Sequence, residues 1–282
     1  MKKRKKQLSK MELLIHLIVK VKNDDIFALA SQLAYYLILS FFPFLIFLST
    51  LLIAINIDVS YMLEILKNIL PTSVFSVCKS IVAEEVSATR TGLMGISILV
   101  LIWTSSSGFR AVIKAINKAY NLCEETSLIR KTIVAYISTF ALGITILIAL
   151  IIFVFGGVIG KYLIAAVPFK EATLIIWNLL RSGVLLIIII FVFAAIYRYV
   201  PCKRLKWREV FPGAVFSSLG WVVVSIIFSY YINNFNNYSR FYGSLSAVFI
   251  LMIWLFLTAI IFLLGVEINA VLFLREDTDS IR

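Results

Sequence analysis

Six long stretches of the chain are almost entirely apolar. They cover approximately residues 27–55, 93–113, 132–159, 173–198, 211–232 and 244–273. A helix of about 20 apolar residues crosses a hydrocarbon core of about 30 Å, so each stretch is long enough to span a bilayer. None of them alternates apolar and polar residues with a period of two, which favours helices over barrel strands. The sequence predicts an all-α fold, a polytopic membrane bundle of six transmembrane helices.

Shorter amphipathic segments lie between and before these spans. Residues 11–22 predict a helix lying in the membrane interface at the start of the chain. Two further segments, 60–69 and 73–86, are separated by Pro71 and predict short helices in an external loop of about 57–91. These helices are expected to pack over the outer mouth of the bundle, either as a lid over a cavity or as a scaffold.

The predicted domains follow the spans. They are a basic tail with the interfacial helix over 1–26, the six-helix transmembrane domain over 27–274, and a tail over 275–282.

Composition and charge support a membrane protein and indicate its orientation in the membrane. Of all residues, 61% are hydrophobic and 15% are charged, against about 45–50% and about 25% in soluble domains. The net charge is +12, and the basic residues gather before the first span, after the second and fourth, and at the C-terminus. The positive-inside rule places these segments, and so both termini, in the cytoplasm. The basic segment 1–10 is expected to contact anionic lipid at the inner surface.

Sites that need clustered ligands are not expected. The three cysteines, Cys78, Cys123 and Cys202, lie on separate segments, and His16 is the single histidine. A disulfide framework or a zinc site needs closely spaced ligands. No phosphate-binding loop of the type G-x-x-x-x-G-K-[ST] is present. We therefore expect no metal, no cofactor and no nucleic-acid partner.

Two ionisable residues lie inside predicted spans, where a charge is costly and requires a cause. Arg181 is in the outer half of the fourth span, and Asn178 shares its helix face one turn earlier. Arg181 either lines a water-filled cavity and attracts an anionic group such as a phosphate, or extends outward to lipid phosphate.

Glu267 lies near the inner end of the sixth span. Arg110 closes the second span at the same predicted depth, and Gln32 and Asn269 are close enough along their helices to join them. We expect an inner cluster of these four residues, which serves either as a structural ion pair or as a gate. The polar faces of the first two spans, with Gln32, Tyr36, Ser105 and Ser106, are the predicted pathway.

Small residues indicate where helices pack closely. Gly213, Ser217 and Gly220 share one face of the fifth span, and Gly156 and Gly160 share one face of the third. In the first span, Pro43 predicts a kink.

Several motifs resemble a known family. The run Ala30–Ser31–Gln32–Leu33–Ala34–Tyr35–Tyr36, with Pro43 after it, resembles the first-span signature of the YihY/virulence factor BrkB family. The segments from Tyr197 to Pro201 and from Leu264 to Asn269 resemble later parts of that family. The resemblance covers about residues 25–274 and implies a bacterial inner-membrane protein with six helices.

Two classes of function remain. The buried charges favour a transporter or permease for an anionic or amphipathic solute or a lipid, and a non-transporting scaffold or envelope assembly factor is the alternative. The family once carried the name ribonuclease BN, but phosphodiester hydrolysis needs clustered ligands or an acid–base pair. No such group is evident, so we expect no enzymatic activity, and a homo-oligomer remains open.

Overall fold

Helices account for the regular structure of the described chain. The computed structural model describes residues 10–54, 58–69, 72–87, 91–122, 129–145, 147–148, 170–234 and 246–280, and no strand occurs in these ranges. The labelled helices are α1 (Lys10–Asn23), α2 (Ile26–Ala54), α3 (Ser60–Ile69), α4 (Thr72–Ser87), α5 (Thr91–Ala119), α7 (Lys170–Tyr199), α8 (Trp207–Asn234) and α10 (Ser246–Ser280). Residues 129–145 are also helical. The predicted all-α class is confirmed.

Four helices are long and apolar enough to cross a membrane. They run over Ile26–Ile53, Ile175–Tyr199, Trp207–Asn234 and Ser246–Leu272, and they coincide with the first, fourth, fifth and sixth predicted spans. The 29-residue helix α5 covers the second predicted span. Residues 149–169, which include much of the third predicted span with Gly156 and Gly160, lie outside the described residues. The chain is a polytopic membrane protein, and the total of six spans stays a prediction.

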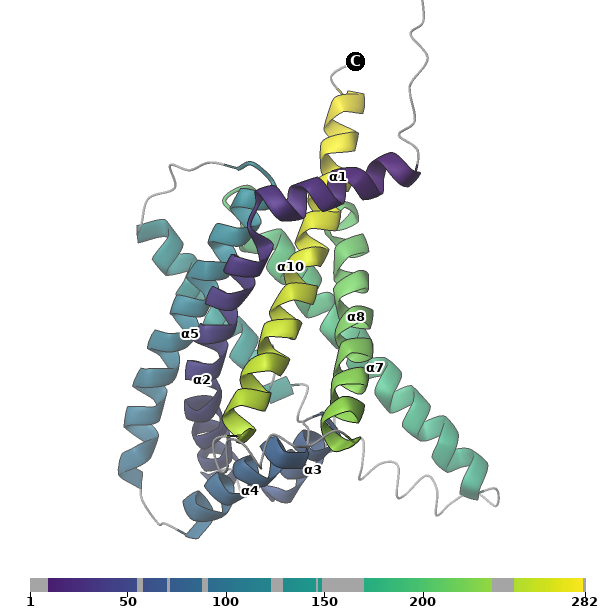
Figure 1. Cartoon of the computed structure of the whole chain (residues 1–282). Coiled ribbons are helices and arrows are strands. Elements are labelled where there is room, and N and C mark those ends of the chain that lie inside the picture. The colour runs from purple at the N-terminus through teal and green to yellow at the C-terminus, as the bar shows by residue number, and fades with distance from the viewer. Residues whose placement is uncertain are drawn as a thin grey trace, which may run out of the picture.

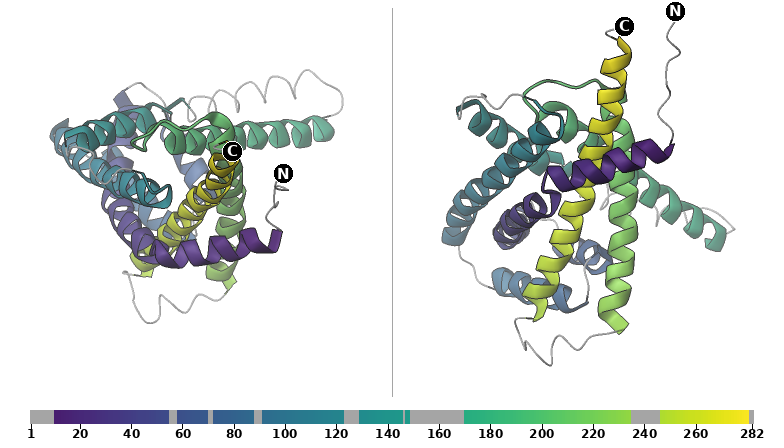
Figure 2. Two further views of the ribbon diagram at one scale, coloured as in Figure 1. Left: turned by 90° about the horizontal axis from the view of Figure 1, so that it is seen from above. Right: turned by 45° about the horizontal axis from the view of Figure 1, so that its top comes forward.

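Helix α10 lies at the centre of the bundle. It packs most extensively against α8 and α2, while α5 packs along α2 and α7 packs along α8. In Figure 1, α1 crosses one end of the bundle, where α10 also finishes, and α3 and α4 lie at the opposite end. We refer to the first of these as the α1 end. Both views in Figure 2 show part of α7 extending away from the other helices.

Helix α1 has the features expected of an interfacial helix. The side chains of Met11, Ile15, Ile18 and Val19 are all exposed, as they would be on a helix whose apolar face enters the headgroup region. The helix ends at a tight corner in which Asp25 has a φ of 53°. This left-handed conformation suits Asp better than most non-glycine residues, and it turns the chain directly into α2.

The short helices at the other end are part of the core. Val74, Cys78 and Val82 of α4 are buried against residues of α2, α8 and α10, such as Leu48 and Ile250. Burial raises the pKa of the Cys78 thiol to about 11, so this thiol stays protonated at neutral pH. A helix buried along one face in this way favours a fixed structural role for the external loop over a mobile lid.

Two glycines allow α8 and α10 to touch backbone to backbone. A Cβ atom on Gly213 would overlap the carbonyl oxygen of Gly265, and a Cβ on Gly265 would overlap the Ser217 hydroxyl. The predicted small-residue face of α8 is therefore a packing face, as small residues at helix crossings usually are. Helix α2 runs through Pro43 as one helix.

Hydrogen bonds reinforce this crossing. The Ser217 hydroxyl donates to the carbonyl of Ile261 (3.0 Å), and the Tyr197 hydroxyl donates to the carbonyl of Phe262 (2.7 Å). The two hydroxyl oxygens are also 2.9 Å apart. One side chain from each of α7 and α8 thus reaches the backbone of α10 beside Gly265, where a larger residue would displace both.

We expect Gly265→Ala to destabilise the protein. The added methyl would overlap the hydroxyl groups of Ser217 and Tyr197, and overpacking of this kind costs about 1–3 kcal/mol. Thermal denaturation of the detergent-solubilised protein should show a lower midpoint. Gly183→Ala is the matched control, because a Cβ there meets nothing within 4 Å. Equal midpoints for the two variants would contradict this account of the crossing.

Candidate functional site

A buried carboxylate on α10 is the centre of the candidate site. The side chain of Glu267 has 0% exposure, and a buried charge requires a partner. The Nζ atom of Lys20, on α1, lies 3.5 Å from Glu267 Oε2 and 2.8 Å from Asp24 Oδ2. One ammonium group therefore faces two carboxyl groups. We call Lys20, Asp24 and Glu267 the α1 cluster.

The α1 cluster corrects the predicted partner of Glu267, which was Arg110. In the described part of the chain, Arg110 instead donates hydrogen bonds to Ser106 (3.4 Å) and Ser107 on its own helix. Hydroxyls three and four residues earlier on α5 lie within reach of the guanidinium group. Lys20 reaches Glu267 because α1 lies across the end of α10 (Figure 1).

The other predicted members of the inner cluster lie elsewhere. Asn269 is buried, where its Oδ1 accepts from the Gly213 backbone N–H (2.6 Å) and its Nδ2 donates to the Val210 carbonyl (3.0 Å). It therefore joins α8 to α10 and serves packing. Gln32 is exposed on the surface of α2, so the structure does not assemble the four-residue cluster.

The predicted pathway residues are partly described. Tyr36 is half-buried where α2 meets α5, and its Cβ lies 3.5 Å from the position a Cβ would take on Gly108. Ser106 is buried and donates to the Trp103 carbonyl (3.0 Å). The side chains of Ser105, Asn178 and Arg181 lie outside the described residues, and their roles stay predictions.

A further polar group, the phenol of Tyr120, lies near Glu267 of the α1 cluster. Burial chiefly raises the pKa of Tyr120, near the end of α5, and its neighbours Tyr197, Glu209 and Glu267 add to the rise. The phenol of Tyr120 therefore stays neutral. Groups from α5, α7, α8 and α10 thus converge at the α1 end.

A second ion pair, on the surface, joins α5 to the turn between α1 and α2. The Nζ atom of Lys118, on α5, lies 3.5 Å from Oδ2 of Asp25, in the turn between α1 and α2. Both side chains are substantially exposed, so this pair contributes little to stability. The buried pair of Lys20 and Glu267 is the stronger constraint on where α1 lies.

The α1 cluster has more carboxyl groups than cations, which is suited to binding and releasing a proton. The described residues contain no group of three His, Cys, Asp or Glu side chains that could hold a metal ion. One cation shared by two carboxyl groups carries excess negative charge unless the cluster also holds a proton. The cluster can therefore bind a proton or exchange its cation.

Sequence reasoning missed Lys20 and Asp24 as site residues. Lys20 near the end of α1 and Asp24 directly after it are four residues apart, a spacing that favours a side-chain pair, and they lie directly before the first span. That signal does not reveal a third partner on α10.

We expect Lys20→Met to destabilise the protein by about 3–5 kcal/mol, because it leaves a buried carboxylate without its cation. Thermal denaturation in detergent measures the loss. Replacing both partners, as Lys20→Met with Glu267→Leu, should recover most of it, and Lys22→Met on the exposed side of α1 is the control. A double variant no more stable than Lys20→Met would contradict the pairing.

Comparisons with known proteins agree with this architecture. A profile of the family described as Virulence factor BrkB matches residues 17–281. A protein of Bacillus subtilis (strain 168), "Putative ribonuclease-like protein YfkH", is 37% identical over 247 residues, which cover 88% of this chain and 90% of that protein.

More distant relatives carry only a membrane description. A UPF0761 membrane protein of Pseudoalteromonas atlantica is 29% identical over 286 residues, covering 96% of this chain and 90% of the relative. One of Alteromonas mediterranea is 27% identical over 263 residues, covering 89% and 84%. No solved structure matches. With the profile extending over nearly all of its length, the chain belongs to the BrkB virulence factor family of membrane proteins.

Proposed function

We propose that this protein is permease-like and moves an anionic or amphipathic solute, or a lipid, across the membrane. The observation that carries the proposal is the contact between Lys20 on the peripheral helix α1 and the fully buried Glu267 on the central helix α10. An ionisable residue within a membrane span commonly belongs to a substrate, ion or proton pathway. In this proposal α1 closes one end of the pathway.

The packing of α1 supports a gating role. Among the described helices, α1 makes its extensive contacts with α10, whereas α10 also packs against α2, α4, α5 and α8. The α1 helix is thus held by few interactions, and segments with few buried contacts open most readily. Protonation of Glu267 or approach of an anion to Lys20 would weaken the closing pair.

The proposed driving force is an ion gradient. The sequence has no phosphate-binding loop, and the cluster of one lysine and two carboxyl groups offers a place for a proton. Proton binding at Glu267 would couple the opening of the α1 end to the gradient.

We also propose that the α1 end faces the cytoplasm in a bacterial inner membrane. The connection between α7 and α8 carries Lys203, Arg204 and Lys206, and this basic content supports a cytoplasmic side. A cysteine replacing Ser80 on α4 should react with an impermeant maleimide in intact cells, whereas one replacing Lys203 should react only after permeabilisation. The Cys202→Ser and Cys123→Ser background removes competing thiols. The opposite pattern would reverse the orientation.

A scaffold function is the second candidate, and the surface of α7 favours it. Of the four helices long and apolar enough to span, α7 is the least buried, and its Ile175, Leu179 and Ile187 are all exposed. Such a face can receive helices of other membrane proteins as readily as acyl chains.

Ribonuclease activity is not part of the proposal. The single histidine, His16, lies on the exposed surface of α1, where Nδ1 is 2.8 Å from the backbone carbonyl oxygen of Glu12. That contact serves the helix itself and creates no acid–base pair of the kind phosphodiester hydrolysis uses.

We expect the purified protein in liposomes to move at least one member of a panel of anionic solutes and fluorescent lipids. Glu267→Gln should abolish proton-dependent flux, and Lys20→Met should increase passive leak, because the closing pair is absent. Glu64→Gln, at an exposed position of α3, and Lys22→Met on α1 are the controls.

Wild-type protein that moves nothing on the panel would contradict the permease and leave the scaffold. Flux that is equal in wild type, Glu267→Gln and Lys20→Met would contradict the gate specifically. Protein abundance and thermal stability are measured for each variant, so a loss of folded protein is distinguished from a loss of flux.

A further inference from the structure

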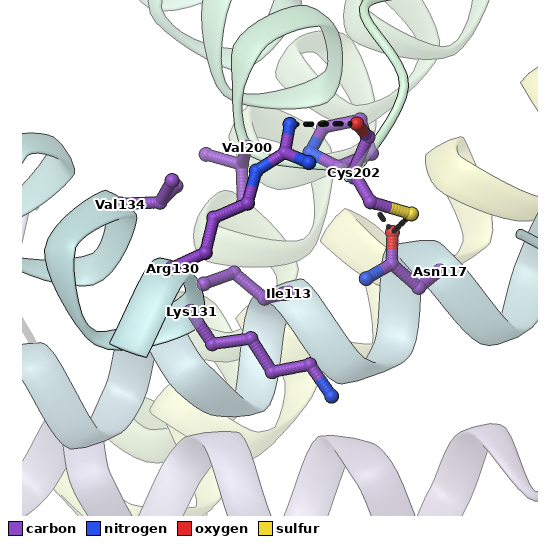
Figure 3. A pocket seen from close by; sticks show the side chains of 8 residues that line it. Ile113, Asn117, Arg130, Lys131, Val134, Val200 and Cys202 are labelled. Atoms are coloured by element: carbon purple, nitrogen blue, oxygen red, sulfur yellow. Dashed lines mark hydrogen bonds between the residues drawn. The ribbon is translucent and has the colours of Figure 1, made fainter. Parts of the chain in front are cut away.

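A groove at the junction of three chain segments has the composition of a lipid headgroup site. It is a shallow surface groove open to solvent, lined by Ile113, Asn117, Arg130, Lys131, Val134, Val200, Pro201 and Cys202. These residues come from the end of α5, the beginning of the helix over 129–145, and the connection between α7 and α8. Figure 3 shows the groove from close by.

The groove is held in shape by contacts to Cys202. Asn117, which is buried, accepts hydrogen bonds through Oδ1 from the backbone N–H of Cys202 (3.0 Å) and from its thiol (3.3 Å). Arg130 donates from Nη2 to the carbonyl oxygen of Cys202 (3.0 Å). Asn117 thus holds the connection to α5, and Arg130 holds it to the helix over 129–145.

Among its described lining residues, the groove has two cations and no acid. Arg130 and Lys131 leave the same helix end and flank Ile113 in Figure 3. The ion pairs among the described residues involve neither of them. A guanidinium group has five N–H donors, and the contact with Cys202 occupies one, so Arg130 retains donors for an anion.

The rest of the lining is apolar. Ile113, Val134, Val200 and Pro201 form this part of the groove. A site for a free phosphate needs no such surface, whereas a phospholipid brings a phosphate joined to glycerol and acyl chains. Cations beside an apolar surface between membrane helices are the typical composition of an anionic phospholipid site.

Aromatic residues next to the groove indicate its depth in the membrane. Tyr199 and Trp207 flank the same connection and are both exposed. The guanidinium carbon of Arg198 lies 5.2 Å from the Tyr199 ring centroid and 4.9 Å from that of Trp207. Exposed Trp and Tyr side chains are enriched at the membrane–water interface, so the groove lies at the level of the lipid headgroups.

We propose that this groove binds one anionic phospholipid, with the phosphate held by Arg130 and the glycerol region against Ile113, Val134 and Val200. The ammonium group of Lys131, on the other side of Ile113 in Figure 3, adds positive charge at the same helix end. The bound lipid would join the helix over 129–145 to the connection between α7 and α8. This site is separate from the α1 cluster, and the proposal does not depend on transport.

The test measures binding of dioleoyl-phosphatidylglycerol in mixed detergent micelles, from the rise in thermal midpoint with lipid concentration. Dioleoyl-phosphatidylcholine and inorganic phosphate are the other ligands. The groove variant is Arg130→Gln with Lys131→Gln. The matched control, Lys203→Gln with Arg204→Gln, removes the same charge from exposed positions outside the groove.

We expect phosphatidylglycerol to stabilise the wild type and the control, and to bind the groove variant about 30-fold more weakly, since each basic residue contributes about a factor of five. Phosphatidylcholine and phosphate should have little effect. Equal binding by the groove variant and the wild type, or an equal loss in the control, would overturn the proposal. Stabilisation by phosphate alone would show an anion site and not a lipid site.

A second measurement uses the wild-type groove and so does not depend on the variant folding. In a Cys123→Ser background, maleimide should react with half-exposed Cys202 well before buried Cys78, whose thiol pKa is raised to about 11. Phosphatidylglycerol should slow labelling of Cys202 severalfold, and phosphatidylcholine should not. Labelling that is equally fast with both lipids would also overturn the proposal.

Discussion

The close crossing of α8 and α10 at Gly213 and Gly265 is the constraint from which the rest of the bundle follows. It brings the two backbones into contact, so that Ser217 and Tyr197 can reach carbonyl groups of α10. One face of α10 is thereby enclosed by neighbouring helices. Glu267 follows Gly265 by two residues and is completely buried. A carboxyl group in that position is costly unless a cation accompanies it. Lys20 of α1, which lies across the end of the bundle, supplies this cation.

That requirement connects the core to the membrane surface. Lys20 belongs to a helix whose exposed side chains include Met11, Ile15 and Ile18, which are the residues that would contact lipid. The same helix therefore has an interfacial face and a residue that neutralises a buried acid. A displacement of α1 away from α10 would lengthen the Lys20–Glu267 contact. The position of a peripheral helix and the environment of a buried acid thus depend on the same side chain.

The sequence predicts the helices well and their contacts poorly, for a physical reason. Hydrophobic length is a local property, and α2, α3 and α4 begin and end within one residue of the predicted bounds. The small face of α8 is also local, and it packs as expected. The partner of Glu267 is not local. Depth in the membrane can be counted along each helix and suggested Arg110, but the docking of α1 across α10 depends on tertiary packing. Arg110 instead donates to serine hydroxyls one turn away on its own helix.

The basic residues near the α1 end divide into two groups with different physical roles. Lys20 and Lys118 lie beside carboxylates and hold α1 and its corner in place. Arg130 and Lys131 belong to a groove whose described lining has no acid, next to exposed aromatic rings. The positive-inside rule counts both groups equally, because it concerns only the side of the membrane. Their described neighbours distinguish them: a cation paired within the protein stabilises the fold, whereas the proposed phospholipid would supply the anion beside Arg130 and Lys131.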